Sequence, residues 1–378
     1  MNDQSALTLL LARGALTRLQ LSEATGLSGP TVSSVIARLT AAGLVSQAGA
    51  TSGSRGPNAV LYHARVERFC GVAVHIRGSR LFACFVEPGV SQHRVIEVRR
   101  AERKSSAVED LSEAIDAACS GADRDRSAIR AVCVGLPGAV SPISDTLSFI
   151  GSLPGWPRRH VRARLEERLG IDVLIGNDAN FAATAEARVG GDDFALAWLG
   201  EGLGVANVTA GQVSPGAGGG AGEIGYLPIS AIGASLDPKA GDLQGLAGAG
   251  AVTRLVRAWR PSVRSYGSAL VALRADERRP MMLADLAPRV AEALSPVIAV
   301  IDPGEVVLSG PTGAAGGEEL AGLVQDRMRQ TTRWRTPIVA TAVPDHPILR
   351  GATLTLIDHL TELMLGQVTA GWSPPVHN

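Results

Sequence analysis

The sequence contains few cysteines and no long run of apolar residues. None of Cys70, Cys84, Cys119 and Cys133 forms a C-x-x-C pair, and three of them sit inside apolar runs. Buried free thiols in a reducing compartment are therefore expected. No apolar stretch approaches ~18 residues without a charged or turn residue, so no membrane span is predicted. The first residues also lack the charged, apolar and cleavage regions of an export signal, which indicates a cytoplasmic protein.

An overall excess of either charge is absent as well. The 378 residues carry 36 Lys and Arg against 36 Asp and Glu, which excludes a global attraction to nucleic acid or membrane. The distribution is uneven, because residues 1–65 hold the cations Arg13, Arg18, Arg38, Arg55 and Arg65 against only Asp3 and Glu23. A basic head on a slightly acidic remainder is typical of nucleic-acid contact by the head alone.

Residues 1–65 show the pattern of a winged helix-turn-helix. Helices are predicted at Ser5–Leu11 and Arg18–Thr25, the second with Thr17 as its N-cap and Gly26 as its stop. Ser28 caps a third helix that has Pro30 in its first turn. One face of that helix is expected to be buried, and it consists of Val32, Val35, Ile36 and Leu39.

The other face of the third helix suits a major groove, because small hydroxyl residues allow close approach to base edges. The predicted DNA contacts on this helix are Ser28, Pro30, Thr31, Ser33, Ser34 and Arg38. Leu44–Ser46 and Val60–Tyr62 are predicted wing strands, and Arg55 with Gly56 in the loop between them is expected to enter a minor groove. A small helical bundle with a solvated polar face is the alternative interpretation.

From residue 66 onward, predicted strands alternate with predicted helices. The strands are Phe69–Val74, Leu81–Val86, Ile129–Val134, Val173–Ile175, Phe194–Leu199, Glu305–Leu308 and Ile338–Ala342. The helices are Val108–Cys119, Val161–Leu169, Asn180–Val189, Ala249–Trp259, Leu283–Val300, Glu318–Thr331 and Leu349–Leu365. This order indicates an α/β architecture of two lobes with ligands at strand carboxyl ends. The expected division is a head at 1–65 and a body at 66–378, whose lobes comprise 66–176 with the terminal helix 349–378, and 177–348.

Several motifs of the body resemble those of the ROK family (repressor, open reading frame, kinase). They are GLPGAV at 135–140, SLPGW at 152–156, GNDANFAATAEA at 176–187, GAGGGAGEIGYLPI at 216–229 and DPGEVVLSG at 302–310. The SRGPNA loop at 54–59 is similar to the linker of the family's regulators. The resemblance implies an actin-like, sugar-kinase-like α/β fold of two lobes, which binds a sugar and assembles as a homodimer or homotetramer.

The same resemblance indicates that the phosphate-binding parts of the kinases are altered. Ala73 stands at the aspartate of the D-x-G-G-T loop, and residues 75–77 replace its Gly-Gly-Thr. Glu201 lies in the second phosphate loop, where its carboxylate would repel phosphate. Asp178 keeps the position of the kinases' catalytic base, but without a held phosphate no transfer is expected. No enzymatic activity and no cofactor are therefore predicted.

The family's sugar contacts map to Ser152, Asn177, Asp178, Glu223, Tyr226 and Gln244. Ser152, Tyr226 and Gln244 depart from the usual residues, which favours a changed but still carbohydrate-like effector; an empty cleft or a conventional sugar is the alternative. For Asp178, helix capping alone is the alternative to ligand contact. Tyr226 also replaces the family's zinc-binding histidine, and the segment after it has no cysteine, so no metal is predicted.

These observations favour a DNA-binding transcriptional regulator of the repressor type that senses a small molecule. Its expected partners are a palindromic duplex operator, a sugar or sugar derivative, and further copies of itself. Two alternatives remain: a ROK sugar kinase with a fused head, and a DNA-binding protein that needs no effector.

Overall fold

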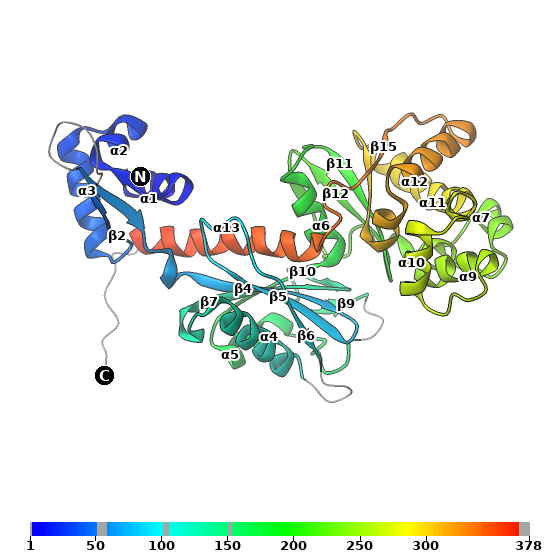
Figure 1. Ribbon diagram of the computed structural model, residues 1–378, viewed down its shortest axis with the longest axis horizontal. Coiled ribbons are helices and arrows are strands. Elements are labelled where there is room, and N and C mark those ends of the chain that lie inside the picture. Colours follow the sequence, from blue (N-terminus) through cyan, green and yellow to red (C-terminus); the bar gives the residue numbers. More distant parts are fainter. Residues whose placement is uncertain (1, 51–58, 101–105, 150–152, 370–378) are drawn as a thin grey trace.

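The computed structural model describes residues 2–50, 59–100, 106–149 and 153–369, which form a small head followed by two α/β lobes (Figure 1). The head consists of α1 (Asn2–Arg13), β1 (Leu16–Thr17), α2 (Arg18–Thr25), α3 (Gly29–Ala41), β2 (Val45–Ala50) and β3 (Val60–Ala64). Its strands pair in the antiparallel order β1-β3-β2. The head therefore has three helices and a wing, as the sequence predicts.

The helix boundaries of the head follow from local hydrogen bonds. Thr17 and Gln20 form a reciprocal capping box at the start of α2. Gly26 ends α2 in the left-handed region with a φ of 70°, and Ser28 caps α3 through the backbone N–H of Thr31. Four apolar side chains of α3 are buried at the predicted spacing: Val32, Val35, Ile36 and Leu39.

The first lobe is built on a five-stranded sheet in the order β10-β7-β4-β5-β6. Its strands are β4 (Cys70–Arg77), β5 (Arg80–Val86), β6 (Ile96–Arg99), β7 (Ile129–Leu136) and β10 (Asp172–Asn177), and η1 (Val66–Arg68) leads into it. Strands β4, β7 and β10 run parallel, whereas β4, β5 and β6 form an antiparallel meander. A hairpin of β8 (Ala139–Val140) and β9 (Leu147–Ser148) follows β7.

The second lobe repeats this plan. Its sheet has the order β13-β12-β11-β14-β15, with β11 (Phe194–Leu199), β12 (Leu203–Thr209), β13 (Gln212–Ser214), β14 (Val306–Ser309) and β15 (Ile338–Ala340). Again an antiparallel meander is extended by two parallel strands. Because parallel strands present their carboxyl ends at one edge, each lobe offers the loops at that edge for binding.

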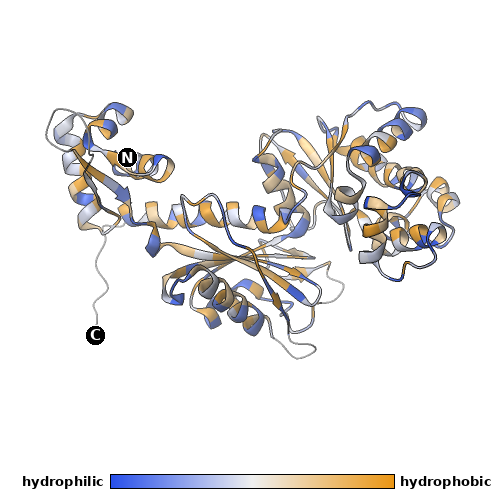
Figure 2. Cartoon of the chain, viewed as in Figure 1, coloured by the Kyte–Doolittle hydropathy of each residue, from blue (hydrophilic) through white to orange (hydrophobic). Residues whose placement is uncertain are grey.

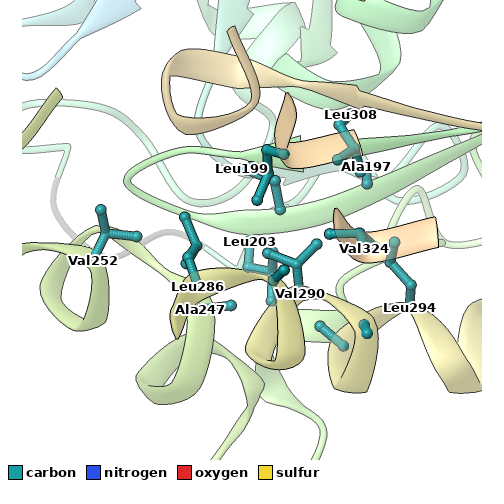
Figure 3. Packing of buried hydrophobic residues seen from close by; sticks show 14 of the residues in the cluster. Ala197, Leu199, Leu203, Ala247, Val252, Leu286, Val290, Leu294, Leu308 and Val324 are labelled. Carbon is teal, nitrogen blue, oxygen red and sulfur yellow. The ribbon is translucent and has the colours of Figure 1, made fainter. Parts of the chain in front are cut away.

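Outer helices cover one face of each sheet. In the first lobe they are α4 (Ala107–Ala122) and α5 (Val161–Leu169), with η2 (Arg126–Ala128) after α4. In the second lobe they are α7 (Ala231–Leu236), α8 (Leu243–Ala247), α9 (Ala249–Trp259), α10 (Tyr266–Ala275), α11 (Arg279–Ile301) and α12 (Gly310–Thr331), preceded by η3 (Ile224–Tyr226). Figure 3 shows Leu286, Val290 and Leu294 of α11 packed under the strands of this lobe.

Two helices, α6 (Asp178–Ala187) and α13 (Pro347–Thr369), lie between the two sheets. They share one hydrophobic cluster with strand residues from both lobes, such as Cys133 of β7 and Leu196 of β11. The strands of both sheets are mainly hydrophobic in Figure 2, as expected for sheets covered on both faces. A change in the angle between the lobes must therefore move packing around α6 and α13.

Helix α13 also reaches the head. Every fourth residue of α13 is buried, and the stripe consists of Ile348, Ala352, Leu356, Leu360 and Met364. The first four belong to the cluster between the sheets, whereas Met364 belongs to the core of the head. Figure 1 shows this helix, in red, running from the lobes to the head. The head thus completes its core with the far end of the chain.

Some sequence-based boundaries were wrong. Helix α6 begins at Asp178 instead of Asn180, because Asn177 is its N-cap. Helix α12 begins at Gly310, eight residues before the predicted Glu318; a break at Gly317, with a φ of 56°, separates the predicted part from the earlier turns. All four cysteines are free and buried, as predicted. Among the described helices, none is long and apolar enough to cross a membrane.

Candidate functional site

A cleft of about 860 Å³ lies between the lobes at the carboxyl ends of β7 and β10. Five of the six predicted ligand residues line it: Asn177, Asp178, Glu223, Tyr226 and Gln244. The sixth, Ser152, lies outside the described residues. Glu201, which was considered from the sequence only as a phosphate-repelling residue, also lines the cleft. Four further lining residues were not singled out from the sequence, because no motif marks them: Arg100, Phe149, Trp198 and Asp242.

The junction of β10 and α6 places Asn177 and Asp178 in the cleft. The Asn177 side chain caps α6, accepting from the Ala179 N–H at 2.8 Å, and donates to the carbonyl of Gly138 at 3.1 Å. Asp178 occupies the first helical position, and its Oδ1 is buried without a hydrogen-bond partner. Capping is therefore performed by Asn177, and the Asp178 carboxyl is left to face the cleft.

Glu223 approaches the same point from the second lobe. Gly222 before it has a φ of 81°, and a Cβ there would overlap the carbonyl of Val205, so only glycine permits this approach. The Asn177 Nδ2 lies 3.5 Å from the Glu223 Oε1. Burial raises the pKa of Glu223 to about 7. Burial, then the charge of Glu201, raises the pKa of Asp178 to about 8; Glu223 adds a smaller increase and Arg77 opposes it.

Replacing Asp178 with asparagine is expected to stabilise the ligand-free protein at alkaline pH. The carboxyl has a higher pKa in the folded chain than its ordinary 3.8, so the folded state binds the proton more tightly and stability falls as pH rises from about 4 to about 8. Asp178→Asn removes that dependence. In urea unfolding, the gain from Asp178→Asn should be larger at pH 8.5 than at pH 5 by ~2 kcal/mol or more. Glu113→Gln, on the exposed face of α4, is the control. An equal gain in stability in this control variant would contradict the raised pKa of Asp178.

The side-chain amide of Gln244 holds part of the cleft wall in place. Its Oε1 accepts from the backbone N–H of Leu203 at 2.7 Å, and its Nε2 donates to the carbonyl of Glu201 at 2.6 Å. Both ends of the amide thus hold the turn between β11 and β12 in place. The bond to Glu201 uses one of the two N–H donors of Nε2, and Gln244 also lines the cleft.

Tyr226 stands at the mouth of the cleft, 61% exposed. Its ring centroid lies 5.6 Å from that of Phe149, which follows β9 in the first lobe. Two aromatic rings from opposite lobes therefore meet across the opening. Contact at this separation is favourable for tilted rings and is lost when the lobes separate.

The segment matching the first phosphate loop forms no glycine-rich turn. Residues 73–77 continue as strand β4, where His75 pairs with Phe82 and Ile76 pairs with Leu81 of β5. The His75 ring is buried against Phe82, and burial lowers its pKa to about 3. A paired strand has no free backbone N–H groups to surround a phosphate.

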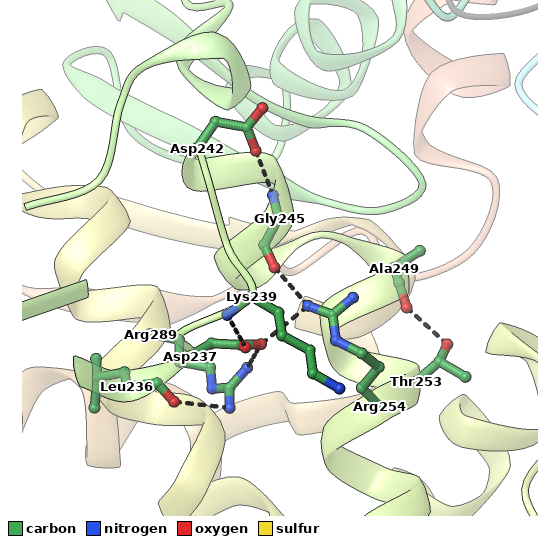
Figure 4. A network of polar contacts seen from close by, with 9 residues as sticks. All are labelled: Leu236, Asp237, Lys239, Asp242, Gly245, Ala249, Thr253, Arg254 and Arg289. Atoms are coloured by element: carbon green, nitrogen blue, oxygen red, sulfur yellow. Dashed lines mark hydrogen bonds and ion pairs between the residues drawn. The ribbon is translucent and has the colours of Figure 1, made fainter. Parts of the chain in front are cut away.

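The segment where family members carry their zinc ligands contains an ion-pair network around Asp237 (Figure 4). The Asp237 Oδ2 lies 2.9 Å from Arg254 of α9 and 3.0 Å from Arg289 of α11, and its Oδ1 accepts from the Lys239 N–H. Among the described residues, no group of three or more His, Cys, Asp or Glu is placed to hold a metal. Charge pairs therefore fix this loop to the helices below it.

Removing the Asp237 carboxylate is expected to loosen the loop that carries Gln244. Asp237→Ala leaves Arg254 and Arg289 facing each other without their shared anion, at an expected cost of ~2 kcal/mol in the free energy of unfolding. Chemical denaturation of the variant measures the loss. Asp326→Ala, at an exposed pair with Arg329, should cost less than ~0.5 kcal/mol. Similar losses in the two variants would show that the network adds nothing beyond a surface pair.

The head places the predicted DNA-contacting residues on one side of α3. Ser28, Pro30, Ser34 and Arg38 are exposed, and Thr31 and Ser33 are partly exposed. The Arg38 guanidinium forms a two-bond ion pair with Asp3 of α1, with its Nε 2.8 Å from Oδ2. That pair orients the arginine and cancels part of the positive charge counted in the sequence. The predicted contacts Arg55 and Gly56 lie outside the described residues.

Comparison with known proteins agrees with this architecture. Residues 81–358 match the ROK family, and residues 2–46 match a winged helix-turn-helix DNA-binding family. A putative xylose repressor of Caldicellulosiruptor sp. (strain Rt8B.4) is 26% identical over 234 residues, 60% of this chain and 58% of that protein. A glucokinase of Halalkalibacterium halodurans is 31% identical over 124 residues, 32% of this chain and 37% of that enzyme. The chain thus spans less than two thirds of either relative.

A solved structure extends the likeness to the whole fold. It is a ROK family transcriptional regulator, a homologue of the E. coli MLC protein, with a TM-score of 0.70 at 19% identity over 98% of both chains. The predicted fold class, a winged helix-turn-helix joined to a two-lobed ROK domain, is thereby confirmed. Since the ROK family match covers most of the sequence and the motifs converge on one cleft, this chain belongs to the ROK family.

Proposed function

We propose that this protein is a DNA-binding transcriptional regulator, of the repressor type, whose ROK domain senses a small carbohydrate-like molecule. One observation carries the proposal: helix α13 belongs to the core between the lobes and also to the core of the winged helix-turn-helix. The helix beside it, α6, begins at Asp178 in the cleft. A ligand that changes the lobe angle therefore acts on packing that continues into the head.

We also propose that the ROK domain lacks kinase activity. Residues 73–77 are paired in strand β4 and do not form a glycine-rich phosphate loop, and Glu201 adds a negative charge beside Asp178. A nucleotide carries several negative charges, so this charge opposes its entry. The glucokinase similarity covers 32% of the chain. A coupled assay for ATP consumption over a panel of sugars should show no turnover.

The carbohydrate-like effector is supported by the cleft and by the relatives. Two of these relatives are a putative xylose repressor and a glucokinase. In this chain Asn177, Asp178 and Glu223 supply polar groups beside the apolar wall of Trp198, a combination that suits a polyol. The alternative without an effector predicts that no small molecule changes stability or DNA binding.

DNA binding is tested by incubating the full chain with genomic fragments and sequencing those retained at low salt. A regulator should retain a small set of sites with two-fold symmetry, read by the Thr31–Arg38 face of two heads in a homodimer or homotetramer. Ser34→Arg adds bulk and charge at the centre of this face and should change the retained sequence. Ser235→Arg, on exposed α7 of the second lobe, should leave it unchanged. Absence of retained fragments at low salt would refute the proposed function.

A further inference from the structure

The cleft between the lobes is strongly acidic. Four carboxyl side chains line it: Asp178, Glu201, Glu223 and Asp242. Among the described lining residues the basic side chain is Arg100, which is buried and already paired with Asp110 at 2.7 Å. Arg100 also donates to the carbonyl of Pro154 at 3.1 Å. Its charge is thus neutralised within the first lobe, and no other described lining residue brings a cation to these carboxyl groups.

Two of these carboxyl groups are held without internal partners that would compensate them. Among the described residues, the buried Asp178 Oδ1 has no hydrogen-bond partner, and the amide of Asn177, at 3.5 Å, is the one partner of the Glu223 carboxyl. Buried carboxyl groups without hydrogen-bond partners lower the stability of the ligand-free protein, because most buried polar atoms in proteins have a partner. The charge of Arg77 on β4 acts on Asp178, but this exposed residue lies outside the cleft lining. The site is therefore built for a donor that comes with the ligand.

The apolar part of the lining is aromatic. Trp198 forms part of the inner wall, and Phe149 and Tyr226 meet at the mouth. Faces of aromatic rings attract cations and also pack against the apolar faces of sugar rings. An anionic ligand is attracted neither by the faces of the aromatic rings nor by the carboxylates. The two kinds of lining group therefore select for the same sign of ligand charge.

We propose that the cleft binds a polyhydroxylated ring that carries a protonated amine, such as an amino sugar or an aminocyclitol, and rejects phosphorylated sugars. The ammonium group lies among the carboxylates of Asp178, Glu201 and Glu223, while the ring hydroxyls use Asn177 and the remaining carboxylate oxygens. A phosphate ester of the same sugar would add two negative charges to a lining that already carries four carboxyls. This inference rests on the proposed function, because it names the class of molecule that the regulator senses.

The test is isothermal titration of the full chain at pH 7.0 with three matched sets of probes. D-glucosamine, D-galactosamine and D-mannosamine are compared with glucose, galactose and mannose, and with glucosamine 6-phosphate. At least one amino sugar should bind about tenfold more tightly than its uncharged parent, and the phosphate should not bind. Equal or tighter binding of a parent sugar or of the phosphate overturns the proposal. Absence of binding by all three amino sugars at 10 mM overturns it as well.

Proton release gives a second readout. Since the pKa of Asp178 is about 8 and that of Glu223 about 7, both groups are partly protonated at pH 7. A cation bound beside them favours the carboxylates, so titrations in two buffers of different ionisation enthalpy should reveal net proton release. An uncharged sugar should release none. Binding of an amino sugar without proton release would place it away from these carboxyls and contradict the proposal.

Variants separate charge from shape. Glu201→Gln keeps the size of an exposed side chain and should weaken binding of the amino sugar about threefold to tenfold, without lowering the melting temperature of the free protein. Glu113→Gln, the same change on the exposed face of α4, should leave the affinity unchanged. Retention of genomic DNA is measured in parallel. A protein that retains DNA but ignores amino sugars refutes this inference alone, whereas one that ignores DNA refutes the proposed function.

Discussion

Replacing Gly351 with alanine should prevent the two lobes from packing together. Gly351 lies on α13, and a Cβ at this position would overlap the backbone carbonyl of Phe181 on α6. The obstacle is main chain on both sides, so no side chain can rotate to make room. The expected loss is at least ~3 kcal/mol in the free energy of unfolding, above the usual range for overpacked side chains. Urea denaturation followed by tryptophan fluorescence measures it.

The matched control for this variant is Gly322→Ala. Gly322 is an exposed residue of α12 whose added Cβ would meet no atom within 4 Å. Alanine is the better helix former by ~1 kcal/mol, so this variant should be as stable as the original chain or slightly more stable. If Gly351→Ala behaved in the same way, the close contact of α6 and α13 would not hold the lobes together.

Replacing Met364 with alanine should abolish DNA retention while leaving the ROK domain folded. Met364 is fully buried in the core of the head, yet it comes from the last turns of α13. Deleting a buried methionine side chain costs ~2–5 kcal/mol, and a domain of about 65 residues has little stability to spare. Hydrogen exchange should therefore accelerate in α1–α3 and stay slow in β4 and β7.

Met281→Ala is the control for that experiment. Met281 lies on α11 and is 41% exposed, so its truncation should change stability by less than ~1 kcal/mol. Retention of genomic fragments should persist in this variant. A Met364→Ala protein that still retained the same fragments with unchanged affinity would show that the head folds without α13 and receives no signal through it.

The cleft shows how far residue patterns predict a site. One cavity is lined by five residues that the motifs predicted: Asn177, Asp178, Glu223, Tyr226 and Gln244. Their motifs lie at strand ends and tight turns, where the local backbone already sets the direction of the side chains. The additional role of Gln244 in holding the turn between β11 and β12 was not predicted, since its amide partners lie about 40 residues away in the chain. Phe149 was missed for the same reason: its partner Tyr226 belongs to the other lobe. Pairings of that kind depend on how the lobes meet.

The helix-turn-helix shows the same division. Its caps at Thr17 and Ser28 and the buried face of α3 follow from residues within four positions of each other, so the sequence by itself determined them. Arg38 pairs with Asp3, which lies 35 positions earlier in the chain. Met364 packs into the core of the head, whose helices lie more than 300 positions earlier. Local hydrogen bonds and periodic burial need only neighbouring residues, whereas a shared core exists only after the chain has packed. Tertiary structure alone therefore decided that the two lobes and the winged helix-turn-helix head are completed by a single helix.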